Sequence, residues 1–598
     1  MRFRLPLLLS LLFFASSTFA IDRWVLISGT VNNFHTDARV FNPTFDKDIS
    51  VNATFHPTDG SGVLTGTVTV PKRQMKVLDD VTTGLFNTTK LGAILFSSAD
   101  TFEVTSRIYA ISTSCPAGAT ATLGQFGPGV DPATALAKGA LLQLKANGNR
   151  GQAGTFRTNI GALNPSNSTV AVTWTLFDKN SALVSTQTKD LGPFGVLAPS
   201  EIRNFLDPKS ADLSDAWISY SATAPILTYA SVLDNSSEDQ TFIPAVEDRV
   251  VSGATQRWVL IAGTVSNFHT DARVFNPTAD KDIQVTATFH PADASGTLTQ
   301  TFAVPRRQMR VLDDVTTFLF ATDKLGAIHF AANDTFEVTS RIYAISTSCP
   351  TGTTATLGQF GPGVDPASAK AKGTLLQLKA NGTRGQAGTF RTNIGALNPS
   401  SSSISVTWTL YDKNSAVVST QTKDLGPFGV IAPSEIRNFL DPKTADLSDA
   451  WVSYSATAPL LAYASVLDNA SEDQTFIPAV EDKGIPLPDP PPQNTKEFFV
   501  TLEDFSITFS PGPTNIVKGD RVTLHIEANS PHTFLLFSPT GQIVVSVNSG
   551  LNDRTFTVDV DGLYQYTCNN ASCGVGHVQM NGSFTVGNVE PPDTGRGY

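Results

Sequence analysis

The sequence predicts an all-β protein in which tandem β-sandwiches precede one further β-domain. Apolar and polar residues alternate over many short segments, which is typical of strands with one buried face. Asn-Pro, Asp-Gly and Gly-Pro pairs separate these segments at spacings typical of sandwiches. Most of the chain is an internal duplication. Only 16% of the 598 residues are charged, so the chain is expected to be globular rather than disordered.

The N-terminus has the features of a secretory signal peptide over residues 1–20. Arg2 and Arg4 precede an apolar stretch, and small residues at Thr18 and Ala20 predict cleavage after Ala20. A retained N-terminal membrane anchor is the alternative. No later stretch of about twenty apolar residues occurs, so no other segment is expected to span a membrane. We therefore expect a secreted, periplasmic or cell-surface protein.

The duplication relates two copies, residues 22–248 and 256–482, without a gap. Trp24 recurs as Trp258, and Cys115 recurs as Cys349, 234 positions further along the chain. Each copy contains a fainter repeat, so each is expected to hold two β-sandwiches. The predicted organisation is a signal peptide (1–20), four sandwiches (22–125, 136–248, 256–359 and 370–482), a Pro-rich linker (483–495), a further domain (496–587) and a disordered tail (588–598).

The strands expected within each copy follow from the same alternation. Ile49–Phe55 and Val170–Leu176 carry apolar residues at every second position, and Thr101–Ala110 and Ile226–Leu233 read as closing strands. The second half of each copy resembles a module common in secreted bacterial proteins. The resemblance rests on three segments that recur in the second copy, and it implies surface placement without catalysis: Phe156–Asn159, Tyr229–Asn235 and Phe242–Ala245.

Charge and motifs exclude several classes of function. The formal net charge is −11, and no basic run follows the leader, so nucleic acid is not an expected partner. The sequence has no serine nucleophile elbow, zinc-protease helix, phosphate-binding glycine loop or haem-attachment motif. We therefore expect no enzyme, and at most an electron-transfer or oxidase-associated redox module.

The C-terminal domain concentrates the metal-binding chemistry of the chain. Cys568, Cys573, His577 and Met580 lie close together in sequence, and His532 lies upstream on a separate loop. Thiolate, imidazole and thioether ligands together suit copper that cycles between two oxidation states. The sequence therefore predicts a site for one or two copper ions.

This domain resembles the cupredoxin family, and within it the copper A domain of cytochrome c oxidase subunit two and nitrous oxide reductase. The resemblance rests on His532, on Tyr564–Cys568 and on Cys573–Gly582. It implies a Greek-key β-sandwich in which Cys568 and Cys573 bridge two coppers, His532 and His577 cap them, and Met580 is a weak ligand. Four residues separate the cysteines, one more than in the family. A single blue-type copper bound by one of the cysteines stays open, as does a structural Cys568–Cys573 disulfide.

Other titratable residues are interpreted as structural. Cys115 and Cys349 are either free buried thiols or a pair that joins the two copies. Asp79-Asp80 and Asp313-Asp314 lack a surrounding loop of oxygen donors and are expected to be turn residues rather than calcium ligands. The histidines expected to have structural or incidental roles are His35, His56, His269, His290, His329 and His525.

Two functions from different classes follow. The first is a copper protein for electron transfer, displayed on a stalk of four sandwiches, with an unidentified redox protein as partner. Copper storage or delivery would use the same site. The second is a structural or adhesive surface protein whose cupredoxin fold binds no metal, since multiplied domains add reach or avidity.

Overall fold

A computed structural model of the chain is all-β. The helices it describes are at most six residues long, and none is long and apolar enough to cross a membrane. The chain forms two compact units, Met1–Ile485 and Pro486–Tyr598. The signal sequence before Ala20, most of the Pro-rich linker, the tail, Cys573 and His577 lie outside the described residues. The structure describes residues 20–206, 212–248, 255–349, 351–440, 446–482, 495–503, 506–517, 520–528, 532–558, 560–568 and 580–587.

The first sandwich of each copy consists of two four-stranded antiparallel sheets. In the first copy (sandwich 1a) the sheet orders are β1-β6-β3-β4 and β5-β2-β7-β8. Alternation places Ile49, Val51, Ala53 and Phe55 of β3 in the core, as the sequence predicts. The strands are β1 (Ile21–Ser28), β2 (Phe34–Phe41), β3 (Ile49–Pro57), β4 (Leu64–Val70), β5 (Met75–Leu78), β6 (Gly92–Ser98), β7 (Glu103–Ser114) and β8 (Ala117–Pro128), with helix α1 (Val81–Phe86) between β5 and β6.

The equivalent sandwich of the second copy (sandwich 2a) has the same topology, with sheet orders β17-β22-β19-β20 and β21-β18-β23-β24. Its elements are β17 (Gln256–Ala262), β18 (Phe268–Phe275), β19 (Ile283–Pro291), β20 (Leu298–Val304), β21 (Met309–Leu312), α3 (Val315–Phe320), β22 (Gly326–Ala332), β23 (Glu337–Ser348) and β24 (Thr351–Pro362). The 3-10 helices η1 (Pro132–Thr134) and η2 (Pro366–Ser368) lead out of sandwiches 1a and 2a.

The second sandwich of each copy is held together by one long strand that runs through both of its sheets. In sandwich 1b this strand is β14 (Ala216–Asp234), which pairs with β9 and β11 along its first half and with β10 and β15 along its second. The other elements are β9 (Leu136–Leu144), β10 (Phe156–Leu163), β11 (Val170–Phe177), β12 (Leu183–Leu191), β13 (Val196–Glu201), α2 (Ile202–Phe205), β15 (Gln240–Pro244) and β16 (Val246–Glu247).

Sandwich 2b repeats this design around β30 (Leu447–Asp468). Its other elements are β25 (Lys370–Ala380), β26 (Phe390–Leu397), β27 (Ile404–Tyr411), β28 (Val417–Leu425), β29 (Val430–Glu435), α4 (Ile436–Phe439), β31 (Gln474–Pro478) and β32 (Val480–Glu481).

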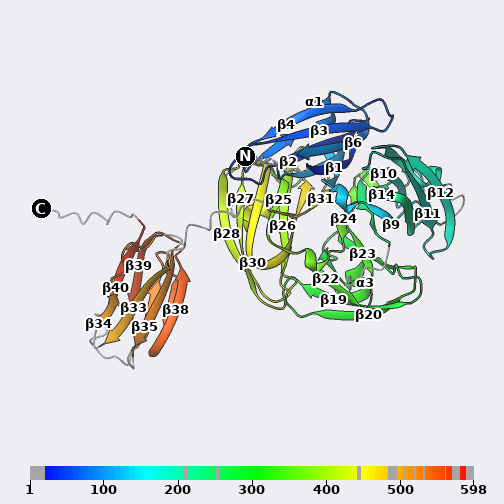
Figure 1. Cartoon of the computed structure of the whole chain (residues 1–598). Helices are drawn as coiled ribbons and strands as arrows, with labels where there is room; N and C mark the ends of the chain where they lie inside the picture. The colour runs from blue at the N-terminus through cyan, green and yellow to red at the C-terminus, as the bar shows by residue number, and fades with distance from the viewer. Residues whose placement is uncertain are drawn as a thin grey trace, which may run out of the picture. The chain divides into compact units, whose positions relative to one another are not determined.

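The four sandwiches close into a ring instead of forming a linear row. Apolar clusters join 1a to 1b around Trp24, 1b to 2a around Trp217, 2a to 2b around Trp258, and 2b back to 1a around Trp451. At the centre, β8 and β24 each contact both β15 and β31. Figure 1 labels β24 and β31 there. The first sandwich therefore contacts the last, which a linear stalk does not allow.

Cys115 and Cys349 form a disulfide, which resolves the choice that the sequence left open. The bond links the β7–β8 turn of the first copy to the β23–β24 turn of the second. Leu123 and Leu357 pack beside it in a small buried cluster. The disulfide is therefore a covalent link between the two copies.

The C-terminal unit is a two-sheet β-sandwich with sheet orders β34-β33-β35-β38 and β37-β36-β39-β40, in which β33 and β35 run parallel. Phe498, Val500 and Leu502 of β33 lie in the core, whereas Phe499 between them is 57% exposed. The strands are β33 (Thr495–Glu503), β34 (Ser506–Ser510), β35 (Arg521–Ala528), β36 (Phe534–Phe537), β37 (Ile543–Val547), β38 (Gly550–Thr557), β39 (Gly562–Thr567) and β40 (Asn581–Val586).

Candidate metal centre

Three adjacent strands bring His532, Cys568 and Met580 to one end of the C-terminal sandwich. In the sheet, Leu535 of β36 pairs with Thr567 of β39, and Thr567 pairs with Asn581 of β40. His532 lies shortly before β36, Cys568 directly follows β39, and Met580 directly precedes β40. Because the strands are antiparallel, these three positions meet at the same end of the sheet.

The side chains of Cys568 and His532 face each other. Cys568 Sγ lies 3.8 Å from His532 Nδ1, and the backbone N–H of Thr533 donates to the same sulfur at 3.3 Å. The backbone N–H of Cys568 donates to the carbonyl of Met580 at 3.0 Å. The exposed fractions of Cys568, His532 and Met580 are 3%, 7% and 0%. Thiol and imidazole therefore share a site with little access to water.

This geometry fits a shared metal ion. Donor atoms that each lie roughly 2.0–2.3 Å from one first-row metal are no more than about 4.4 Å apart, and the sulfur–nitrogen separation is 3.8 Å. The N–H of Thr533 points at the sulfur, so a backbone donor already lies beside the atom that would bind a metal. Cys568 and Met580 belong to the apolar core of the C-terminal unit, which also contains Phe534 next to Thr533.

The structure brings together three of the five predicted ligands. The other two, Cys573 and His577, lie outside the described residues. Among the residues that are described, no group of three or more His, Cys, Asp or Glu side chains is arranged to hold a metal. Sequence reasoning missed Thr533, because a backbone donor leaves no sequence signal beyond its position next to His532.

The histidines interpreted as structural lie in packed or ion-paired positions. His35 Nδ1 lies 3.4 Å from an oxygen of Asp80, and the half-buried His525 is 2.8 Å from Asp553. His56 packs on Trp24, and burial lowers its pKa. His329 stacks on Trp258 with ring centroids 4.5 Å apart. The corresponding contacts in the second copy are His269 with Asp314 and His290 with Trp258.

Comparisons with known proteins give no family. No protein-family model matches the chain, and no curated protein matches it. A crystal structure of Thermotoga maritima 1070 aligns at 14% identity over 19% of this chain and 97% of its own, with a TM-score of 0.16. Native Escherichia coli alpha-2-macroglobulin aligns at 10% identity over 92% of this chain and 35% of its own, with a TM-score of 0.10. Dimeric latent PorU from Porphyromonas gingivalis aligns at 10% identity over 60% of this chain and 35% of its own, also with a TM-score of 0.10.

Proposed function

We propose that the C-terminal unit is a cupredoxin-like domain that binds copper and transfers electrons outside the cytoplasm. The observation that carries the proposal is the buried contact between Cys568 Sγ and His532 Nδ1 at 3.8 Å. A thiolate and an imidazole at this separation are a donor pair suited to copper. The resemblance adds Cys573, His577 and Met580 to the ligand set.

Copper, when bound, supplies reversible one-electron chemistry, and the residues of the chain supply its environment. Cys568 and His532 would hold the ion, from positions beside the neighbouring strands β39 and β36. The backbone N–H of Thr533 would donate to the sulfur ligand. The bond from Cys568 N to Met580 O holds the start of β40 beside the site. A site on rigid strands changes little in geometry when the electron arrives or leaves.

The number of coppers depends on the second cysteine. If Cys568 and Cys573 both reach two ions, the site is a bridged pair like copper A. If only one cysteine binds, the site is a single blue-type copper. The proposed partner is a redox protein, and the proposed location is the periplasm, the cell surface or the exterior. The Cys115–Cys349 disulfide supports this location, because disulfides persist in oxidising compartments.

The test is a copper titration of the mature full-length chain, followed by absorption and electron paramagnetic resonance spectroscopy. A seven-line spectrum is expected for a bridged mixed-valence pair, and a four-line spectrum with intense blue absorption for a single copper. Cys568→Ser and His532→Ala should abolish either signal. His525→Ala is the matched control, because this histidine lies on β35 in the other sheet and pairs with Asp553 on β38.

One outcome would overturn the proposal. If the chain takes up no copper and mass spectrometry finds a Cys568–Cys573 bond, the C-terminal unit is a metal-free scaffold. The protein would then be a structural or adhesive surface protein.

A further inference from the structure

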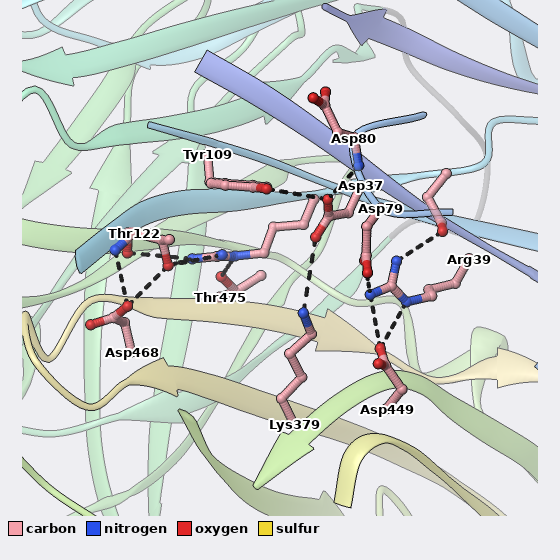
Figure 2. Close-up of polar contacts among 12 residues, drawn as sticks. Asp37, Arg39, Asp79, Asp80, Tyr109, Thr122, Lys379, Asp449, Asp468 and Thr475 are labelled. Atoms are coloured by element: carbon pink, nitrogen blue, oxygen red, sulfur yellow. Dashed lines mark hydrogen bonds and ion pairs between the residues drawn. The ribbon is translucent and has the colours of Figure 1, made fainter. Parts of the chain in front are cut away.

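The contact between the two copies, residues 22–248 and 256–482, is reciprocal: hydrogen bonds from the first copy to the second have equivalents from the second to the first. At the centre of the ring, the N–H groups of Thr122 and Gly124 on the edge strand β8 donate to Asp468 and Asp473 of the second copy, at 2.9 and 2.7 Å. Figure 2 shows Asp468 reaching Thr122. The equivalent bonds run in the opposite direction at the same two distances: Thr356 to Asp234 and Gly358 to Asp239.

An arginine beside each edge strand makes a second contact between the copies. Arg107 donates through Nε to Thr475 Oγ1 at 3.2 Å, and Arg341 donates to Thr241 Oγ1 at 3.1 Å. Gly124 makes room for the first arginine, because a Cβ there would lie 2.9 Å from Arg107 Cζ. Gly358 does the same for Arg341, at the same 2.9 Å. The contact therefore depends on a glycine and an arginine that both copies carry.

Ion pairs between the copies, away from the centre of the ring, are reciprocal in the same way. Arg39 is fully buried and donates to Asp449 of the second copy and to Asp79 of its own, both at 2.8 Å. Figure 2 shows the guanidinium of Arg39 between these two carboxylates. Arg273 is also fully buried and is placed in the same way, between Asp215 of the first copy and Asp313 of its own.

Aromatic packing repeats as well. Phe41 lies on Trp451 with ring centroids 5.0 Å apart, and Phe275 lies on Trp217 at 4.9 Å. The copies differ at other positions, such as Leu95 against His329, yet every residue in these paired contacts is the same in both. Two bodies that exchange identical contacts about a two-fold axis form an isologous interface, which is the interface of a symmetric dimer.

We infer that each two-sandwich unit is self-complementary and binds a second copy of itself in the geometry seen between the two halves of this chain. The chain is then the covalently joined form of such a dimer, with residues 249–255 between its two near-identical units. The partner that fits the surface of either half is an identical unit, which another chain can supply. This inference does not depend on the copper site.

The test uses the full-length chain with a protease site in 249–254 and with Cys115→Ser and Cys349→Ser. After cleavage, the halves are allowed to exchange in dilute denaturant, and native mass spectrometry identifies the pairs under native buffer. We expect first–first and second–second pairs beside first–second pairs, with the like pairs at about half of the total if the surfaces are equivalent.

Reversing charges at the interface makes the test selective for like pairs. In a first–first pair, Arg39 of one unit faces Asp215 of the other. Arg39→Asp, combined with Asp215→Arg and with Asp79→Asn to remove the carboxylate that pairs with Arg39 inside its own copy, keeps that attraction, but in a first–second pair it sets like charges against Asp449 and Arg273. Like pairs should then rise to nearly all of the total. Adding Asp449→Arg and Arg273→Asp, with Asp313→Asn to remove the carboxylate beside Arg273 in its own copy, is the matched control, because it restores attraction between unlike halves.

Two results would overturn the inference. One is recovery of only first–second pairs, both before and after the charge exchange. The other is halves that remain single once the linker is cut, since a self-complementary surface needs no linker to hold its partner.

Discussion

The buried carboxyl of Asp473 gives a prediction that runs against the usual effect of removing a charge from an interface. Its Oδ2 accepts the N–H of Gly124 across the contact between the copies at 2.7 Å, and its Oδ1 has no hydrogen-bond partner among the described residues. Burial raises the pKa of Asp473 to about 7, the bond from Gly124 and the charge of Arg107 oppose this rise, and Asp468 adds to it. Burial and the charge of Asp473 also raise the pKa of Asp239 well above its usual range.

The sign and the size of the effect follow from linkage. In the unfolded chain an aspartate titrates near 3.8, so between about 3.8 and about 7 the folded state holds a proton that the unfolded state has lost. The stabilisation is complete below about 3.8, declines through this window and is absent above about 7. At about 1.4 kcal/mol per pH unit, roughly 3 units correspond to a loss of about 4 kcal/mol.

Asp473→Asn keeps an oxygen for the N–H of Gly124 and carries no charge at any pH. Its free energy of unfolding should therefore exceed that of the parent by a margin that grows by about 3 kcal/mol between pH 5 and pH 8. Calorimetry of the mature chain at both pH values measures this as a widening difference in Tm.

The matched control is Asp468→Asn, because the carboxylate of Asp468 is already saturated. It accepts bonds from Thr122 N and Oγ1 and from the N–H groups of Ala470 and Ser471. Loss of its charge weakens charge-assisted bonds and should lower the Tm at both pH values. An Asp473→Asn margin that is the same at pH 5 and pH 8 would refute the linkage argument.

Three further predictions concern the ring. Replacing Cys115 and Cys349 by serine removes a cross-link that spans 234 residues, and it should lower the free energy of unfolding by up to about 5 kcal/mol, measured as the Tm of the oxidised and the variant chains. Trp451→Ala removes a fully buried ring that stacks on Tyr411, and it should lower the free energy of unfolding by about 3–5 kcal/mol, measured by the same calorimetry. An unchanged Tm would show that the contact between 1a and 2b is dispensable. Burial lowers the pKa of His290 to about 4, so its stabilisation is present above about 6.5 and is lost as the pH falls towards 4; an NMR titration with a midpoint near 6.5 would contradict this.

The strands were predictable from the sequence because the alternation of apolar and polar residues that marks them is a local pattern. The alternation in Ile49–Phe55 became β3, and that in Val170–Leu176 became β11. The prediction of Ile226–Leu233 recovered only the second half of β14, which begins at Ala216. Pro225 lies inside β14, and the strand continues past it with a register shift between Ser221 and Ile226, where it passes from one sheet to the other.

The ligands of the candidate site could be predicted only as far as the resemblance to cupredoxins identifies them. His532 and Cys568 are 36 residues apart, and only the pairing of β36 with β39 brings them together. The ring was not predictable in this way. Arg39 and Asp449 lie 410 positions apart, and each looks in sequence like an ordinary surface charge. Asp79 and Asp80 were predicted to be turn residues, and the partnership of Asp79 with a buried arginine depends on the fold of both copies.

Closure of the ring follows from what a single copy would leave unsatisfied. The edge strand β8 presents the N–H groups of Thr122 and Gly124 away from its own sheet, and an open edge of this kind invites pairing with another chain. The same copy carries Asp234 and Asp239 in the turn that follows β14, and their carboxylates are fully buried in the ring. Each copy therefore has both an edge that needs acceptors and a turn that supplies them, and in the ring each edge bonds to the turn of the other copy. A second copy satisfies both needs at once, which explains why duplication gives one closed body in place of independent domains along a string.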